Sequence, residues 1–288
     1  MAKFSGLYVA IITPMTKDFA VDLDGLRQHA SWLIDAGVTG LVATGSCGEY
    51  ATLDNQEREQ VIRTLAEVSR GRVPLVVGVA SAASHMAVHW AKLARELEAA
   101  GIMALPPIQY RPRWEEVRAH YGLLDAVGLP IIVYNNPYDT AVDITPDRIA
   151  ELARDFPQVV AIKEFSGDVR RVLAIQERSP VEIIAGTDDL LVESVLAGAT
   201  GWIAGMANII PHESMNLLQW LAQGDVGKAW AMYRRLLPLL RYDSTPGLVQ
   251  IIKAGLDYIG RPVGPTRPPR LPLEPQDVEV IESVLSNL

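Results

Sequence analysis

The sequence predicts an α/β protein whose eight strand-helix units close into a (β/α)8 TIM barrel, followed by a C-terminal helical extension. Short apolar runs recur eight times with helix-like segments between them. No Gly-x-Gly-x-x-Gly or phosphate-loop lysine motif favours an open sheet. The 288 residues are also sufficient for a barrel of roughly 250 residues and a tail. We expect the barrel to occupy residues 1–224 and the helical region residues 225–288.

The eight expected strands are short and rich in Val, Ile, Leu and Ala, as strands buried on both faces of a parallel sheet are. They occupy residues 6–15, 37–45, 73–79, 101–108, 129–137, 159–167, 182–188 and 201–208. Their regular alternation with helical segments indicates a parallel sheet closed into a barrel.

Helix start and stop signals lie between these runs. Predicted helices at 24–36, 52–69 and 84–100 each end at or close to a glycine. Thr145 supplies an N-cap for a further helix, and Pro146 its first residue.

The strand pattern stops after residue 224. Helices are expected at 225–242, 245–259 and 275–288. We interpret the proline-rich stretch 261–275 between the last two as a rigid surface turn, with an SH3-type ligand as the alternative.

The composition is that of a globular protein with a large core. Hydrophobic residues make up 49% of the chain, charged residues 21%, and the formal net charge is −8. An acidic chain without Lys/Arg-rich runs has no general attraction to phosphate backbones, so nucleic acid is not an expected partner. The single cysteine, Cys47, allows no intrachain disulfide. Because we find no signal-peptide profile and no apolar run near the ~18 residues of a membrane span, we predict a cytoplasmic protein without a membrane partner.

Lys163 is the strongest candidate for a catalytic residue. It lies within an apolar strand, whereas the other lysines are terminal, in a polar turn or in predicted helices: Lys3, Lys17, Lys92, Lys228 and Lys253. Burying an unpaired ammonium is costly, so such a lysine is neutralised or paired. A neutral amine at the C-terminal end of a barrel strand is the nucleophile that forms a Schiff base with a ketone. The alternative is a structural lysine paired with Glu164 or Asp188.

Two further strand ends carry groups suited to this chemistry. Tyr134 ends the fifth strand, one strand away from Lys163, where a phenol can relay protons; simple packing is the alternative. The second strand ends in a glycine-rich turn, residues 44–49, whose backbone N–H groups and small hydroxyls can hold a carboxylate.

Together these motifs resemble the dihydrodipicolinate synthase and N-acetylneuraminate lyase family of class I pyruvate-type aldolases. The similarity covers essentially the whole chain through motifs at 13–14, 45–49, 134–137, 162–164, 186–188 and 201–203. The resemblance implies Lys163 as the Schiff-base lysine, Tyr134 as the proton relay and Ser46 as a further catalytic residue of that relay.

The same resemblance implies a binding site for a small 2-oxo acid. Ser46 and the backbone amide of Cys47 would form the pocket for the 2-oxo carboxylate, and Gly186 and Ile203 would line the site through their backbone carbonyls. The resemblance further implies catalysis without a cofactor or metal, by a homotetramer built as a dimer of dimers.

Four positions depart from the pattern of dihydrodipicolinate synthases. These enzymes resemble one another in having two threonines in the glycine turn, an interface tyrosine after strand four and an arginine two residues beyond the strand-five proline. Here these positions are Ser46-Cys47, Gln109 and Asp139. Because an aspartate reverses the charge of an arginine that binds a substrate carboxylate, aspartate semialdehyde is not the expected second substrate. Tyr110 faces the opposite side of an extended segment, so any part of Gln109 or Tyr110 in the relay stays open.

We therefore expect a Schiff-base lyase outside lysine biosynthesis. Its reaction would be aldol cleavage or condensation, or dehydration, of a 2-keto-3-deoxy or 4-hydroxy-2-oxo acid through Lys163, with pyruvate or a keto-deoxy sugar acid as ligand. The alternatives within the family are a pyrroline-4-hydroxy-2-carboxylate deaminase and a 4-hydroxy-tetrahydrodipicolinate synthase. From other classes, the alternatives are a catalytically silent barrel that binds a 2-oxo acid and a metal-dependent class II aldolase, although His85 and His89 lack a third ligand.

Overall fold

Eight parallel strands form the centre of the fold in the computed structural model, which describes residues 3–108 and 110–288. They are β1 (Gly6–Ala10), β2 (Gly40–Ala43), β3 (Leu75–Gly78), β4 (Gly101–Ala104), β5 (Ile131–Asn135), β6 (Val159–Glu164), β7 (Glu182–Ala185) and β8 (Gly201–Ala204). Their order is that of a closed barrel, β1 to β8. The predicted barrel class is confirmed.

Helices follow the strands in alternation. They are α1 (Leu23–Asp35), α2 (Asn55–Ser69), α3 (Ser84–Glu96), α4 (Trp114–Asp125), α5 (Pro137–Thr140), α6 (Pro146–Asp155), α7 (Arg170–Gln176), α8 (Leu191–Leu196), α9 (Pro211–Ala222), α10 (Val226–Leu240), α11 (Leu248–Tyr258) and α12 (Pro275–Leu285). The last three confirm the predicted C-terminal helical extension. The predicted domain boundary at residue 224 remains a prediction.

The strands end earlier than the sequence predicts. The run predicted as 101–108, for example, leaves the sheet after Ala104 although the next residues, Leu105 to Pro107, stay buried. Apolar composition reports burial, and it does not distinguish a strand from a buried loop. The helix predicted from residue 52 begins at Asn55, because Asp54 and Glu57 form a capping box there.

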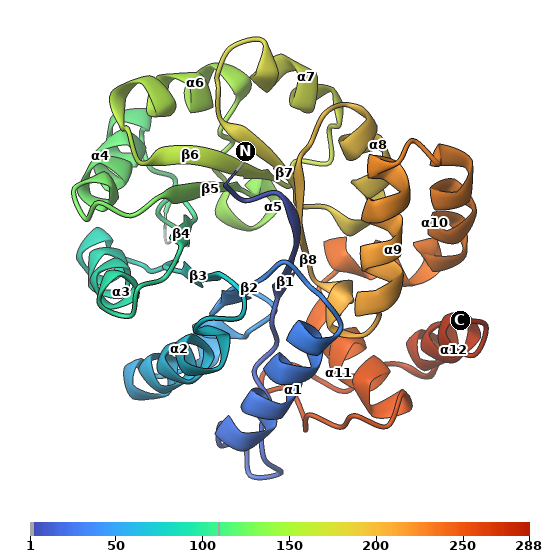
Figure 1. Cartoon of the computed structure of the whole chain (residues 1–288). Helices are drawn as coiled ribbons and strands as arrows, with labels where there is room; N and C mark the ends of the chain where they lie inside the picture. Colours follow the sequence, from blue (N-terminus) through green and yellow to red (C-terminus); the bar gives the residue numbers. More distant parts are fainter. Residues whose placement is uncertain (1–2, 109) are drawn as a thin grey trace. The chain divides into compact units, whose positions relative to one another are not determined.

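By its contacts the chain divides into two compact units. The first contains Pro74–Ile203 together with the N-terminal segment up to Gly6. Its strands from β3 to β8 pair in succession, and α4, α6 and α7 lie outside them (Figure 1). Thr145 caps α6 as predicted, and its hydroxyl accepts from the Arg148 N–H.

The second unit comprises Leu7–Val73 and Ala204–Leu288, and within it β1 pairs with β2. Asn208 joins distant parts of this unit: its amide oxygen accepts from the Ile12 N–H at 3.2 Å and from His29 Nε2 at 3.0 Å. The Asn208 Nδ2 group donates to the carbonyl of Ala10 at 2.8 Å. His29 is fully enclosed, and this burial lowers its pKa to about 4.

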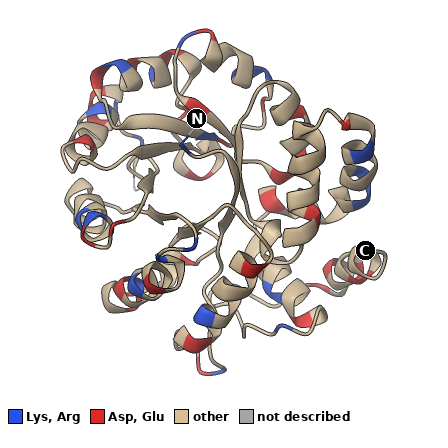
Figure 2. Ribbon diagram, viewed as in Figure 1, with Lys and Arg blue, Asp and Glu red and all other residues tan. Residues whose placement is uncertain are grey.

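Charged residues lie mainly on helices and loops, and few of them lie on the strands (Figure 2). This distribution agrees with a parallel sheet covered on both faces. Among the described residues, none of the helices is both long and apolar enough to cross a membrane.

Candidate active site

Strand β6 carries Lys163 one residue before its end. The residue is 6% exposed. The sheet register places Tyr134 of β5 and Ile184 of β7 opposite Lys163. Because side chains alternate along a strand, Lys163 and the following Glu164 project from opposite faces of the sheet. The side chain of Glu164 therefore does not share a face of the sheet with that of Lys163.

The amino group of Lys163 lies against aromatic rings. Its Nζ is 4.4 Å from the ring centroid of Tyr134 and 5.8 Å from that of Phe165. The two rings meet edge to face, with centroids 6.2 Å apart. Aromatic faces attract a cation, but they do not supply the counter-charge of a carboxylate. In the part of the chain that the structure describes, no carboxylate forms an ion pair with Lys163.

Glu164 and Asp188, the two partners considered for a structural lysine, have other contacts. Glu164 accepts from Asn135 Nδ2 at 3.1 Å and from the Ser166 N–H at 2.6 Å. Burial raises the pKa of the Glu164 carboxyl against the opposite effect of these hydrogen bonds. Asp188 accepts from Trp202 Nε1 at 2.8 Å. The structural ion pair with Lys163 is therefore not formed with either residue.

The hydroxyl of Tyr134 is held by the residues that follow β5. Asn136 Nδ2 lies 3.3 Å from Tyr134 Oη and donates to it. The same Nδ2 group donates to Asp139 Oδ2 at 2.7 Å, and Asn136 Oδ1 accepts from the Asp139 N–H at 3.2 Å. Asn136 thereby caps α5, which Pro137 begins.

Gly186, directly after β7, lies against Lys163. Its N–H donates to the Glu164 carbonyl at 3.0 Å. A Cβ at this position would lie 2.6 Å from that carbonyl oxygen and 3.0 Å from Lys163 Cγ. Any larger residue would displace the end of β6, so the close approach requires glycine.

The glycine-rich turn with Ser46 and Cys47 follows β2 in the second unit. Thr44 and Glu49, at φ 49° and 54°, hold its two ends in the left-handed region. The Thr13 hydroxyl donates to the Gly48 carbonyl at 2.8 Å. Ser46 is half-buried, and Cys47 is buried and forms no disulfide.

A buried ion pair anchors this turn. Lys253 Nζ in α11 lies 2.7 Å from Glu49 Oε1 and donates to the Pro265 carbonyl at 2.8 Å. The Arg267 N–H donates to Glu49 Oε2 at 3.1 Å, and Arg270 Nε lies 3.7 Å from the same oxygen. Burial lowers the pKa of Lys253, and the charge of Glu49 opposes this effect.

Sequence reasoning missed Lys253, because it lies in a helix and lysines on helices are usually at the surface. Its side chain is 5% exposed, so Lys163 is not the one buried lysine. The apolar residues on both sides of Lys253, from Leu248 to Leu256, were the available signal.

The structure brings together three of the six predicted site residues, Lys163, Tyr134 and Gly186. Ile203 of β8 is fully buried in the same unit, while Ser46 and Cys47 belong to the second unit. The catalytic and binding roles of all six remain predictions. Gln109 lies outside the described residues, and Tyr110 is 54% exposed.

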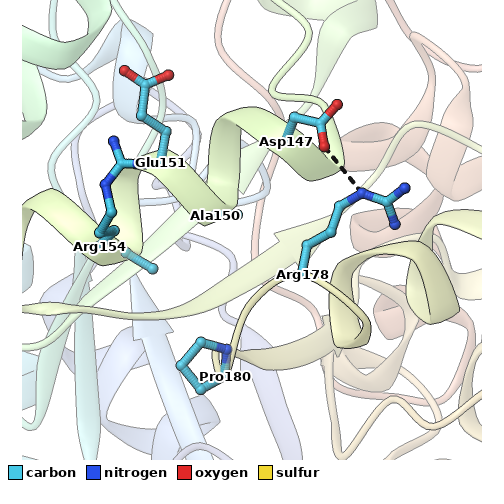
Figure 3. A pocket seen from close by; sticks show the side chains of 7 residues that line it. Asp147, Ala150, Glu151, Arg154, Arg178 and Pro180 are labelled. Atoms are coloured by element: carbon cyan, nitrogen blue, oxygen red, sulfur yellow. Dashed lines mark hydrogen bonds and ion pairs between the residues drawn. The ribbon is translucent and has the colours of Figure 1, made fainter.

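A separate surface pocket of about 480 Å³ lies over α6 (Figure 3). Its charged side chains bind one another or their neighbours: Arg178 Nε contacts Asp147 at 3.0 Å, and Arg154 Nε contacts Asp155 at 2.9 Å. Glu151 binds Arg118 at 2.8 Å. With these charges compensated on an open helix surface, the pocket is not the candidate active site.

A closed (β/α)8 barrel with a buried strand lysine beside a tyrosine is the arrangement expected of a class I aldolase-type lyase. The sequence profile described as the dihydrodipicolinate synthetase family matches residues 3–288, so the chain belongs to this family.

Individual relatives agree with this assignment. The chain is 32% identical over 286 residues to the 4-hydroxy-tetrahydrodipicolinate synthase of Methanocaldococcus jannaschii, covering 99% of each chain. A putative dihydrodipicolinate synthetase from Pseudomonas aeruginosa superposes with a TM-score of 0.94 at 32% identity, covering 98% of this chain and 99% of that one. YagE, a prophage protein of this family from E. coli K12 solved in complex with pyruvate, has a TM-score of 0.92 at 28% identity, covering 99% and 98%.

These comparisons confirm the predicted family and the prediction of a class I aldolase-type lyase. They also change the order of the reactions considered. The names of the relatives support the synthase alternative better than the cleavage or dehydration of a keto-deoxy acid, which was the leading expectation.

Proposed function

We propose that this protein is a Schiff-base lyase that binds pyruvate or a similar 2-oxo acid covalently through Lys163. The observation that carries the proposal is the position of Lys163: its amine is buried, has no carboxylate partner among the described residues and lies over the Tyr134 ring. A lysine with these surroundings is suited to react as a nucleophile. The pyruvate complex of YagE supports pyruvate as the ligand to test first.

The first step is addition of the Lys163 amine to C2 of the 2-oxo acid. The nitrogen lone pair forms the C–N bond, the carbonyl oxygen takes up a proton, and the nitrogen releases one, with Tyr134 as the relay. The hydroxyl of the carbinolamine then leaves as water with the proton of Tyr134, which gives a protonated imine and a phenolate. The phenolate removes a proton from C3 and leaves a neutral enamine. The protons and charges balance without an external acid.

The second step is formation of a carbon–carbon bond at C3. We propose the reaction named for the relatives, 4-hydroxy-tetrahydrodipicolinate synthesis, as the first reaction to test. In it the enamine C3 attacks the aldehyde carbon of aspartate semialdehyde, the aldehyde oxygen takes the proton of Tyr134, and the imine on Lys163 forms again. The amino group of the semialdehyde portion then attacks the imine carbon, which closes the ring and releases the Lys163 amine, and the Tyr134 phenolate takes back a proton from the ring nitrogen.

A second candidate is favoured by Asp139. Its carboxylate lies within two hydrogen bonds of the Tyr134 hydroxyl, through Asn136. Fixed negative charge there repels an anionic aldehyde and accepts hydrogen bonds from hydroxyl or amino groups. A hydroxylated 2-oxo acid, or the cyclic imine of a pyrroline-4-hydroxy-2-carboxylate deaminase, carries a hydroxyl group that could donate such a hydrogen bond to Asp139.

We propose further that Ser46 and the Cys47 amide bind the carboxylate of the 2-oxo acid. We also propose that the protein is a homotetramer and that it is cytoplasmic. A Ser46→Ala variant is expected to raise KM for the 2-oxo acid more than it lowers kcat, because the hydroxyl binds the carboxylate in both the ground and the transition state.

Reductive trapping tests the covalent step. Borohydride added with pyruvate should attach one reduced pyruvyl group to the peptide that contains Lys163, and Lys163→Ala should remain unlabelled. Lys228→Met, which removes a lysine from the outer helix α10, is the matched control and should label normally. An unlabelled Lys163 in the wild-type protein, in conditions that label a known Schiff-base aldolase, contradicts the proposal. Turnover of pyruvate with aspartate semialdehyde, measured beside hydroxylated 2-oxo acids and the cyclic imine, then separates the two candidates.

A further inference from the structure

Two hydrogen bonds join the Asn136 side chain to Asp139, one to its carboxylate and one from its backbone N–H. Asp139 Oδ2 accepts from Asn136 Nδ2 at 2.7 Å, and the Asp139 N–H donates to Asn136 Oδ1 at 3.2 Å. Asn136 is 2% exposed, whereas Asp139 lies at the surface of α5. An exposed carboxylate thus fixes a buried amide whose nitrogen also lies 3.3 Å from Tyr134 Oη.

The orientation of that amide decides what the Tyr134 hydroxyl does. The two ends of an asparagine amide have nearly the same shape, but one end only donates hydrogen bonds and the other only accepts them. With the oxygen toward Tyr134, the phenolic proton would be consumed in a hydrogen bond to Asn136. With the nitrogen toward Tyr134, the phenolic oxygen accepts and its proton points elsewhere.

We propose that Asp139 is a positioning residue that acts through Asn136 to keep the Tyr134 proton available for transfer. An ionised carboxylate accepts hydrogen bonds and donates none, so the amide end that faces the Asp139 carboxylate is the nitrogen, and the Asp139 N–H binds the oxygen at the other end. That nitrogen is the one that reaches Tyr134. The inference rests on the proposed role of Tyr134 as the relay in imine formation.

The arrangement also bears on specificity. Because Asp139 is already bound to Asn136, a substrate carboxylate at this edge would meet a negative charge and compete for the Asn136 amide. We expect the substrate group that lies near α5 to be uncharged or a hydrogen-bond donor.

The Asp139→Asn substitution tests the positioning role. The asparagine side chain has the size of aspartate, and the backbone N–H of residue 139 still donates to Asn136 Oδ1. The variant loses the charged acceptor that binds Asn136 Nδ2, so the amide is held in its orientation less strongly. We expect the rate of imine formation, followed by rapid-quench borohydride trapping at saturating pyruvate, to fall roughly threefold to tenfold. KM for pyruvate and the melting temperature should stay close to the wild-type values, because no substrate contact or buried group is removed.

A double-variant cycle tests whether Asp139 acts through Asn136. Asn136→Ala should slow imine formation by about tenfold or more. Adding Asp139→Asn to that variant should have no further effect, since the intermediary is already absent. Asp147→Asn removes an exposed aspartate from α6, outside the site, and should change nothing. Independent, multiplicative effects of the two site variants would overturn the proposal, as would a normal imine rate in Asp139→Asn.

The outcome is distinguishable from failure of the proposed function. If Lys163 forms no imine in the wild-type protein, the Schiff-base proposal itself is wrong. If Lys163 is labelled at the same rate in wild type and Asp139→Asn, the covalent chemistry stands and only the positioning role is refuted.

Discussion

Lys163 and Lys253 are buried to almost the same degree, with 6% and 5% of the residue exposed, but their surroundings differ completely. Lys253 is compensated by Glu49 at 2.7 Å and by the Pro265 carbonyl at 2.8 Å. Lys163 has aromatic rings around its amine and no carboxylate partner among the described residues. The Lys253 ammonium is therefore paired within the structure, whereas the Lys163 amino group is not paired with a carboxylate of the described residues.

This difference shows that burial alone does not distinguish a candidate nucleophile from a structural lysine. A satisfied ion pair holds the ammonium form and contributes to the structure, whereas a buried lysine without a carboxylate partner is a candidate for covalent chemistry. The Lys253–Glu49 pair anchors the turn that contains Ser46 and Cys47, because Glu49 ends that turn. We therefore assign a structural role to Lys253 and propose the covalent role for Lys163.

Lys163→Met is expected to have the largest effect on activity. Methionine has a similar length, cannot form an imine and suits the apolar surroundings, so turnover should fall by at least about four orders of magnitude, as loss of a covalent catalyst does. The free energy of unfolding should stay within about 1 kcal/mol of wild type, because no ion pair is broken. Denaturant unfolding measures it. A loss of several kcal/mol would mean that Lys163 is structural and would abolish the contrast.

Lys253→Met should give the opposite result. Removing this lysine leaves Glu49 buried without its main counter-charge, and breaking such a pair typically costs about 3–5 kcal/mol. The protein that remains folded should still be labelled at Lys163 by pyruvate and borohydride. Adding Glu49→Gln should recover part of the lost stability. Unchanged stability of Lys253→Met would show that Arg267 and Arg270 suffice for Glu49.

Acidification should weaken the fold in both units to a similar extent. Burial lowers the pKa of His29 in the second unit and of His120 in the first, each to about 4. The unfolded chain binds these protons near pH 6.5 and the folded one does not, so stability falls as the pH decreases from about 6.5 to 4. The loss is up to roughly 3 kcal/mol for each histidine.

Unfolding curves recorded across this pH range measure the loss. His29→Asn and His120→Gln should each flatten the pH dependence. A stability independent of pH in this window would refute the assignment of both histidines as buried and neutral.

Glu164→Gln should have the smallest effect. Burial already raises the pKa of this carboxyl, and a glutamine retains one acceptor for the Ser166 N–H or Asn135, so the cost should be about 1 kcal/mol. The rate of trapping at Lys163 should change less than twofold, because Glu164 faces the other side of β6. A tenfold slower rate would show that Glu164 supports Lys163, as Glu49 supports Lys253.

Several features of the site followed from local sequence. The apolar run around Lys163 predicted its strand and its burial, and Tyr134 was predicted correctly at the end of the neighbouring strand. The positions at which the strands end were predicted less accurately from the sequence. The loops after the strands are also buried, so the apolar pattern continued past the last residue of the sheet.

The sequence by itself determined the barrel and its strand lysine, because hydrophobic period, caps and glycines act over a few neighbouring residues. The tertiary structure decided which buried lysine has a counter-charge. Glu49 and Lys253 come from distant parts of the chain, and no local pattern records their approach. The tertiary structure also decided that Asn136 donates a hydrogen bond to Asp139, because this contact depends on the direction of the side chains after β5. Ion pairs and hydrogen bonds of this kind depend on distances of a few ångströms, which only the folded chain defines.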